Sequence, residues 1–230
     1  MTIFKMFELS DLFALAVFLG AWLAYAVVLE KTDFSKQSLN RRMNDFRSIW
    51  IRRVLHREVR MVDMQIMTAL QNGNAFFAST SLIAIGGALT LLRSTDEALS
   101  VVKSLPIGLQ PSSGLWEIKA IGLIVILTYT FFKFSWSYRL FNYVAIMLGA
   151  MPFAADRASP EAELHVVRTT ALFQAAGRHF NRGQRAFFFA LGYLGWFISP
   201  WLFVATTLGI VTVLWRRQHK SDAFLAMGLS

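Results

Sequence analysis

The chain has 230 residues, and its 55% hydrophobic and 16% charged residues leave too little polar surface to cover a soluble domain, which indicates a membrane protein. The formal net charge is nonetheless +9, and a basic excess on an apolar chain favours anionic lipid head groups over nucleic acid as partners. Cysteine is absent, which excludes disulfides, thiolate metal sites and thiol nucleophiles.

Four segments are apolar enough for helices that cross about 30 Å of hydrocarbon at about 1.5 Å per residue. They cover residues 9–29, 72–92, 115–135 and 187–215. No alternating strand pattern lies between them, so we expect an all-α integral membrane helical bundle with four transmembrane helices. The whole chain, 1–230, is then a single membrane domain.

Lysine and arginine residues near the span ends predict the topology, because they stay on the cytoplasmic side of a bacterial inner membrane. The connections 31–70 and 150–186 carry nine and five of these residues, whereas 93–117 carries two. We therefore expect both basic connections in the cytoplasm and both termini in the periplasm. The basic tail 216–220 argues against this topology, since it would be translocated. If the tail stays inside, one of the four spans must be re-entrant.

The third apolar segment continues without proline to Gly149, and as one helix it would be about 51 Å long. Its second half would then project into the cytoplasm, with Lys133 at the head-group boundary and Arg139 beyond it. The alternative is a buried polar network, or an ion pathway, along one side of this helix. Its candidate residues are Thr128, Lys133, Ser135, Arg139 and Asn142. The candidate acidic partners of a buried arginine are Glu30, Asp63 and Asp156.

Small residues recur on two spans at the spacing that lets helices pack closely. They are Ala16, Gly20 and Ala24 in the first span, and Ala75, Ser79 and Gly86 in the second. We expect these faces to pack on other helices of the same chain, and a homo-oligomer that uses them is the alternative. In the last span, Gly192, Gly195 and Pro200 indicate bending or close approach.

Both cytoplasmic connections contain helical signals. Apolar residues recur at helical spacing between 39 and 70, among arginines, which predicts a basic amphipathic helix along the inner membrane surface. An ordinary positively charged loop folded against the bundle is the alternative. The candidate lipid head-group contacts are Arg41, Arg42, Arg52, Arg53 and Arg60. Ser159 and Pro160 suit the start of a second helix, which we expect to reach about Phe180 before a break at 181–183.

The sequence has none of the usual catalytic motifs, neither a glycine-rich phosphate loop nor G-x-S-x-G nor HExxH. We therefore expect no enzymatic activity, cofactor or metal. We also expect no nucleic-acid binding, because the basic residues lie where topology requires them. The expected function is that of a non-enzymatic scaffold, or of a protein that binds a partner or membrane lipids. The alternative is an ion or small-solute pathway lined by the polar residues of the third span.

Several motifs carry a resemblance to a known family. Residues 133–143 (KFSWSYRLFNY) and 149–152 (GAMP) resemble the signature of a bacterial and plant membrane family called domain of unknown function 599. Residues 178–186 and 196–203 are similar to its C-terminal half, and residues 60–79 resemble the entry to its second span. The resemblance implies a multi-span membrane protein and brings no activity, cofactor or catalytic residue.

Overall fold

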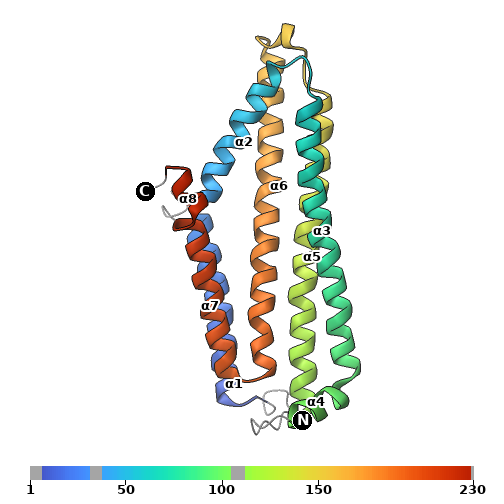
Figure 1. Cartoon of the computed structure of the whole chain (residues 1–230), viewed down its shortest axis with the longest axis vertical. Coiled ribbons are helices and arrows are strands. Elements are labelled where there is room, and N and C mark those ends of the chain that lie inside the picture. The colour runs from blue at the N-terminus through green and yellow to red at the C-terminus, as the bar shows by residue number, and fades with distance from the viewer. Residues whose placement is uncertain (1–6, 32–37, 105–111, 229–230) are drawn as a thin grey trace.

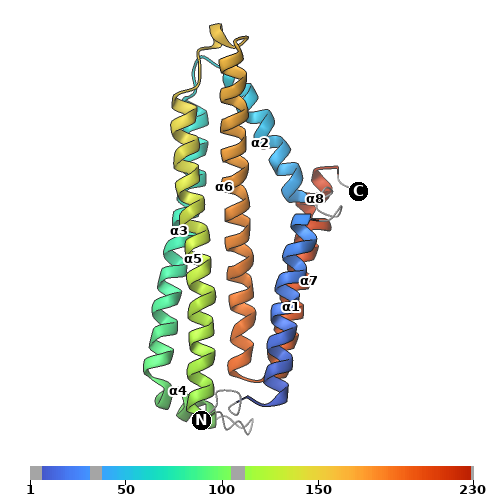
Figure 2. The ribbon, with the colours of Figure 1, turned by 180° about the vertical axis from the view of Figure 1, so that it is seen from behind.

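A computed structural model describes residues 7–31, 38–104 and 112–228, and in it the chain is an elongated bundle of helices (Figures 1 and 2). Within these residues there is no β-strand, which confirms the all-α class. The elements in chain order are α1 (Leu9–Lys31), α2 (Leu39–Leu55), α3 (Met61–Arg93), α4 (Thr95–Ser104), α5 (Ser113–Gly149), η3 (Ala154–Asp156), α6 (Pro160–Tyr193), η4 (Leu194–Phe197), α7 (Pro200–His219) and α8 (Asp222–Ala226).

The bundle has two halves along its long axis, which meet where the rings of Phe77, Phe134 and Phe180 contact one another. The proximal half consists of α1, α7, η4 and the parts of α3, α5 and α6 on the α4 side of these rings. The distal half consists of α2 and the remaining parts of α3, α5 and α6. Each half has its own buried apolar cluster, which includes Phe18 in the proximal half and Phe173 in the distal half.

Among the described residues, α1, α3 and α5 are the helices long and apolar enough to cross a membrane. They match the first three predicted spans. The helix α5 continues without a break to Gly149, as predicted, and its 37 residues make it about 55 Å long. It therefore runs through both halves of the bundle (Figure 1).

Serine N-caps begin many of the helices. In α2, α5, α6, α7 and α8 a serine side chain accepts a hydrogen bond from a backbone N–H three residues later, which satisfies one of the unpaired groups of the first turn. For α6 these residues are Ser159 and Ala162, and Pro160 follows the cap, which confirms the predicted start.

The predicted break at 181–183 is wrong, because α6 continues to Tyr193. Gly183 lies inside the helix, where its missing side chain makes room for the Phe134 ring of α5. A Cβ atom at this position would lie 2.9 Å from Cδ1 of that ring. The glycine therefore serves close packing between α5 and α6 and not a turn.

The predicted span 187–215 is not one helix. Its chain leaves α6 at Tyr193, passes through η4, and begins α7 at Pro200 after the extended residue Ser199. Proline has no N–H to continue a helix from the preceding turn, so the chain reverses direction and α7 runs back beside α1 (Figure 1). The start of α1 and the end of α7 consequently lie at opposite ends of the proximal half.

The predicted amphipathic stretch between 39 and 70 is divided between two helices. One helix, α2, begins at Leu39 as predicted but ends at Leu55, and the chain turns before α3. The buried side chains Val54 and Leu55 of α2 belong to the distal core, and α2 packs along α6. In Figure 2, α2 lies beside α6 and oblique to the bundle axis. Because α2 packs along α6, its buried side faces that helix.

Candidate functional site

The polar residues predicted on α5 do not form a buried network around an arginine. Arg139 is exposed, and its Nε donates a 2.9 Å hydrogen bond to the Tyr143 hydroxyl one turn later. Asn142 is half-buried and accepts a 2.7 Å hydrogen bond from Gln71 of α3. The geometry contradicts a buried Arg139, since this side chain lies on the outer surface.

The other three candidates of this group lie nearer the middle of the bundle. Thr128 and Ser135 are half-buried, and the Lys133 ammonium lies 4.9 Å from the centre of the Tyr129 ring. Of the proposed acidic partners, Asp63 accepts hydrogen bonds from Arg57 and Trp50 instead, and the side chain of Glu30 lies outside the described residues. The five residues are therefore spread along α5 and make separate contacts.

The small residues predicted to pack inside the chain lie mostly on its outer surface. Ala16, Gly20, Ala24, Ser79 and Gly86 are exposed, and Ala75 is half-buried. The expectation of internal packing is wrong for α1, whose opposite face is buried. There the Phe18 ring lies 4.9 to 5.6 Å from four other aromatic rings, so large side chains fill this interface. Contact between two chains through the small faces stays a prediction.

Two of the five predicted head-group arginines are engaged within the chain. Arg52 donates two hydrogen bonds of 2.9 and 2.8 Å to the Glu163 carboxylate of α6. These contacts raise the pKa of Arg52 and hold the pKa of Glu163 below its ordinary value. Arg60 donates to the backbone carbonyls of Met151 and Pro152, and thereby ties the two distal connections together.

The other three predicted arginines are exposed on α2. Arg41 lies 3.9 Å from Asp45, and Arg42 lies over the Phe46 ring at 5.8 Å. Both are in the first turn of α2, whose Asn40 N–H donates to Gln218 near the end of α7. Arg53 lies farther along α2, at the edge of a groove.

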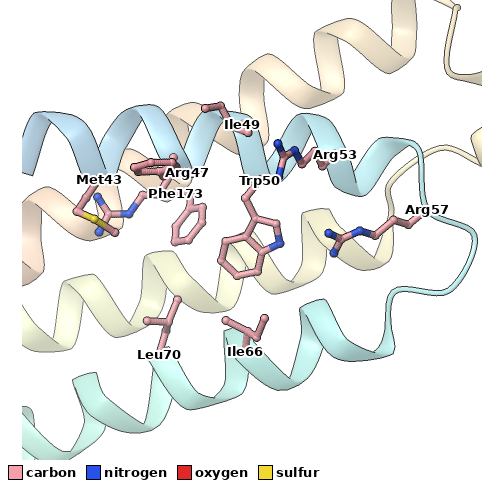
Figure 3. Close-up of a pocket in the computed structure, with 10 residues that line it drawn as sticks. Met43, Arg47, Ile49, Trp50, Arg53, Arg57, Ile66, Leu70 and Phe173 are labelled. Atoms are coloured by element: carbon pink, nitrogen blue, oxygen red, sulfur yellow. The ribbon is translucent and has the colours of Figure 1, made fainter. Parts of the chain in front are cut away.

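This groove, which we call the arginine groove, lies between α2 and α3 in the distal half and has a volume of about 460 Å³ (Figure 3). Its apolar lining consists of Met43, Phe46, Ile49, Trp50, Ile66, Leu70 and Phe173. Its charged lining consists of Arg47 and Arg53 of α2 and Arg57 of the turn that follows α2. Five of these apolar side chains are between 37% and 45% exposed, namely Met43, Phe46 and Ile49 of α2 and Ile66 and Leu70 of α3.

Hydrogen bonds and ring contacts hold two of these arginines in place. Arg47 donates a 2.6 Å hydrogen bond to Asn44 and lies over the Phe173 ring at 5.4 Å. Burial and the neighbouring Arg178 charge lower the pKa of Arg47. Arg57 pairs with Asp63, whose carboxylate is buried. Since Asp63 is the one acid touching these arginines among the described residues, the groove keeps a positive excess.

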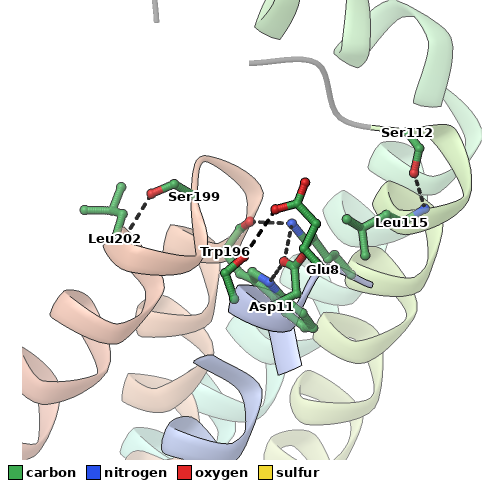
Figure 4. Close-up of polar contacts among 9 residues, drawn as sticks. Glu8, Asp11, Ser112, Leu115, Trp196, Ser199 and Leu202 are labelled. Atoms are coloured by element: carbon green, nitrogen blue, oxygen red, sulfur yellow. Dashed lines mark hydrogen bonds and ion pairs between the residues drawn. The ribbon is translucent and has the colours of Figure 1, made fainter. Parts of the chain in front are cut away.

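A buried ion pair in the proximal half is the polar site that the sequence analysis missed (Figure 4). The Lys119 ammonium of α5 lies 3.5 Å from the Asp11 carboxylate of α1, and both side chains are buried. Trp196 of η4 joins them, because its indole N–H donates to Asp11 at 2.6 Å and its carbonyl accepts from Lys119 at 2.9 Å. Asp11 and Lys119 each lie inside a predicted span. A lone charged residue in an apolar span was the sequence signal that could have identified this site.

Among the described residues, no group of three or more His, Asp or Glu side chains is arranged to hold a metal ion. In comparisons with known proteins, residues 13–223 match the family described as "Protein of unknown function, DUF599". No matching curated protein or solved structure was found. The match extends from α1 into α8 and includes both the arginine groove and Lys119. The chain therefore belongs to the DUF599 family, as its motifs predict.

Proposed function

We propose that this protein is a non-enzymatic, multi-pass protein of a bacterial inner membrane that holds a partner protein in its arginine groove. The proximal half crosses the membrane, and the distal half projects into the cytoplasm. The observation that carries the proposal is the row of three arginines beside an exposed apolar lining between α2 and α3. The membrane placement comes first, because it decides which molecules can reach the groove.

Charged side chains lie at two levels along the proximal half, and these levels would be the two boundaries of the membrane. The buried ion pair lies at one level, and at the other Arg185 lies 6.0 Å from the Tyr25 ring while Arg217 donates to Gln184. From Pro200 to Arg216, α7 rises about 24 Å, close to the thickness of a hydrocarbon layer of about 30 Å.

The reversal at Pro200 therefore adds a crossing to the predicted four. The five crossings are α1, α7 and the proximal parts of α3, α5 and α6. The start of α1 is then periplasmic and the end of α7 cytoplasmic. This arrangement keeps the basic tail 216–220 beside the other basic residues, in agreement with the positive-inside rule.

The placement can be tested with single cysteines, because the native chain has none. Ser113 and Ala223 are exposed and neither is an N-cap, so their replacement by cysteine leaves the capping bonds intact. We expect an impermeant maleimide to label Ser113→Cys in intact cells and Ala223→Cys only in inverted vesicles. Labelling of both from the outside would instead support four crossings with two periplasmic termini.

Arg41 and Arg42 are the basic residues of α2 best placed for anionic lipid head groups. They are exposed, and they lie in the turn that Asn40 ties to Gln218 at the proposed cytoplasmic boundary. Arg52 and Arg60 lie farther from this boundary and bond within the chain. We therefore assign head-group contact to the first pair only.

The groove itself fits an amphipathic helix with an acidic side. From Met43 to Arg53 the groove follows α2 for about 15 Å, which is about three helical turns. It extends away from the proposed membrane boundary, so a lipid held in the bilayer cannot fill it. Exposed apolar side chains would receive the apolar face of the helix, and the arginines would face its acidic residues.

A binding experiment tests this part of the proposal. The probe is a synthetic amphipathic helix with leucines on one face and glutamates on the other, added to the full chain in nanodiscs of uncharged lipid. We expect Arg53→Gln to weaken binding up to about fivefold, since an exposed ion pair contributes about 0.2–1 kcal/mol. Salt should weaken binding of the native chain as well.

Arg168→Gln is the matched control, because Arg168 is an exposed arginine of α6 that does not line the groove. It removes the same charge and should leave affinity nearly unchanged. Equal losses in the two variants would mean that the probe responds to net charge alone. Binding only to vesicles of anionic lipid, with no affinity for the peptide, would favour a lipid-binding surface over a partner groove.

A further inference from the structure

Asp63 is a buried acid at one end of the arginine groove. It lies in the first turn of α3, and its Oδ1 atom accepts hydrogen bonds from the indole N–H of Trp50 in α2 and from Arg57 in the turn after α2. The Asp63 side chain is 1% exposed, and its other oxygen, Oδ2, accepts no hydrogen bond from the described residues. Asp63 therefore bridges the two walls of the groove and depends on Arg57 to balance its charge.

This pairing commits Arg57 to Asp63. The Arg57 side chain is 44% exposed, and in Figure 3 its guanidinium group points toward Trp50. If Arg57 moved away to bind a partner, it would leave a buried carboxylate without a counter-charge, which is costly. Arg57 therefore stays beside Asp63, and the two side chains together contribute no net charge to the groove.

The other two arginines of the groove keep their charge. Arg47 donates to the side-chain oxygen of Asn44, which is a neutral amide, and Arg53 forms no ion pair with the described residues. Arg47 and Arg53 are six residues apart on α2, or about 9 Å along its axis. Acids seven residues apart on a helix share one face and lie about 10.5 Å apart. A partner helix with this spacing therefore places one acid beside each charged arginine.

We propose that Asp63 determines which partner helices the arginine groove prefers. As a built-in acid it balances Arg57, so the groove favours acids beside Arg47 and Arg53 only. The inference rests on the proposed function of the groove as a partner site. An acid of the partner beside Arg57 would meet an ion pair and not a free cation, so it would gain little attraction. Removing the Asp63 charge should restore that attraction.

A set of four probes tests the proposal on the full chain in nanodiscs of uncharged lipid. The parent probe is an amphipathic helix with leucines on one face and three glutamates beside it, spaced by seven and then four residues. Each of the other three probes has glutamine in place of one glutamate. A second set with the reversed spacing covers the opposite direction of binding along α2, and the set that binds more tightly is used.

With the native chain, we expect two of the three replacements to weaken binding by up to about fivefold, since each removes an exposed ion pair. The third replacement should change the affinity by less than about 1.5-fold, because its glutamate faces the Arg57–Asp63 pair. Arg53→Gln should abolish the contribution of one of the two effective glutamates and leave the third glutamate silent.

Asp63→Asn identifies the cause of this silence. Asparagine keeps an oxygen that accepts from Trp50 but removes the charge that balances Arg57. The silent glutamate should then contribute up to about fivefold to binding, like the other two. Asp45→Asn is the matched control, because Asp45 lies near Arg41 on α2 and does not line the groove. It removes the same charge and should leave all three contributions unchanged.

Three equal contributions with the native chain would overturn the proposal, and this comparison needs no substitution in the protein. A larger contribution from every glutamate in Asp63→Asn, or the same gain in Asp45→Asn, would overturn it too, by showing that net charge alone governs binding. Both outcomes leave the groove intact as a partner site. If no probe bound to the native chain, the groove itself would be rejected, and this inference with it.

Discussion

The proximal and distal halves share three helices but are held together by different interactions. The proximal core is built from aromatic rings around Phe18 and encloses the Lys119–Asp11 ion pair. The distal core is largely aliphatic, and its ion pairs are Arg52–Glu163 on the surface and Arg57–Asp63, in which the carboxylate is buried but the arginine is partly exposed. Each shared helix therefore carries different residue types along its length, and a hydropathy averaged over the whole helix hides this change.

The outer side of α5 shows the change most directly. In the proximal half it exposes Ile121, Val125 and Phe132, and in the distal half it exposes Tyr138 and Arg139 together with Ile146. Hydrocarbon surroundings suit the first group, and water or a partner protein suits the second. Breaking interactions in one half at a time should sharpen this contrast.

The largest expected effect comes from the buried ion pair. Lys119→Met leaves the Asp11 carboxylate buried with Trp196 as its remaining hydrogen-bond partner among the described residues, so we expect a loss of about 3–5 kcal/mol in unfolding free energy. Unfolding in detergent micelles is the measurement. Lys133→Met, which removes a half-buried lysine from the same helix, should cost about 1 kcal/mol or less.

A second substitution shows whether charge is the cause. Asp11→Asn combined with Lys119→Met removes both charges and retains an oxygen that accepts from Trp196. We expect the double variant to be more stable than Lys119→Met alone. A double variant as unstable as the sum of its parts would mean that side-chain shape, and not pairing of charge, holds the proximal end together.

An intermediate effect is expected at Gly122, where the Tyr193 hydroxyl lies against the α5 backbone and overlaps the place of a Cβ atom. Gly122→Ala should destabilise the protein by about 1–3 kcal/mol through overpacking, as measured by thermal unfolding. Tyr193→Phe should restore part of this loss, because the next ring atom, Cζ, would lie 3.1 Å from the added methyl group.

Gly86→Ala is the control for that substitution. Gly86 is in a helix, and nothing lies within 4 Å of an added Cβ atom. This change should be neutral or should stabilise the protein by up to about 1 kcal/mol. Similar losses at both glycines would show that backbone freedom, rather than contact with Tyr193, is what matters at Gly122.

The smallest effect is expected at the surface ion pair of the distal half. Because Arg52 holds the folded-state pKa of Glu163 below its ordinary value of 4.5, this pair contributes stability above that value and loses it as the pH falls through the lowered pKa. Glu163→Gln should therefore lower the melting temperature slightly at pH 7 and by less at pH 3.

The control is Glu161→Gln, in the same first turn of α6. It should show a smaller difference between the two pH values, since both residues interact with the helix dipole but only Glu163 bonds to Arg52. A pH dependence of the same size in both variants would assign the effect to the helix dipole.

Much of the fold was predictable from local signals. Apolar runs identified α1, α3 and α5, and Ser159 with Pro160 marked the start of α6. Pro200 was recognised as a point of bending, but the reversal was not, because an apolar run looks the same whether it crosses once or turns back. The polar contacts were less predictable, since they join distant segments.

The Lys119–Asp11 contact illustrates this limit. The two residues are 108 positions apart, and neither α1 nor α5 alone indicates a partner for its charge. The exposed position of Arg139 likewise depends on where α3 and α6 pack around α5. Helical phase gives the angle of a side chain on its own helix, but the neighbours decide whether that angle points inward.

The uninterrupted course of α5 through both halves has a mechanical consequence. A rod about 55 Å long that tilts by about 5° about one end moves its other end by about 5 Å. The same rod transmits rotation, since no proline interrupts its hydrogen bonds. Tilting the proximal part of α5 would thus shift the part of this helix that packs on α3 and α6 in the distal half.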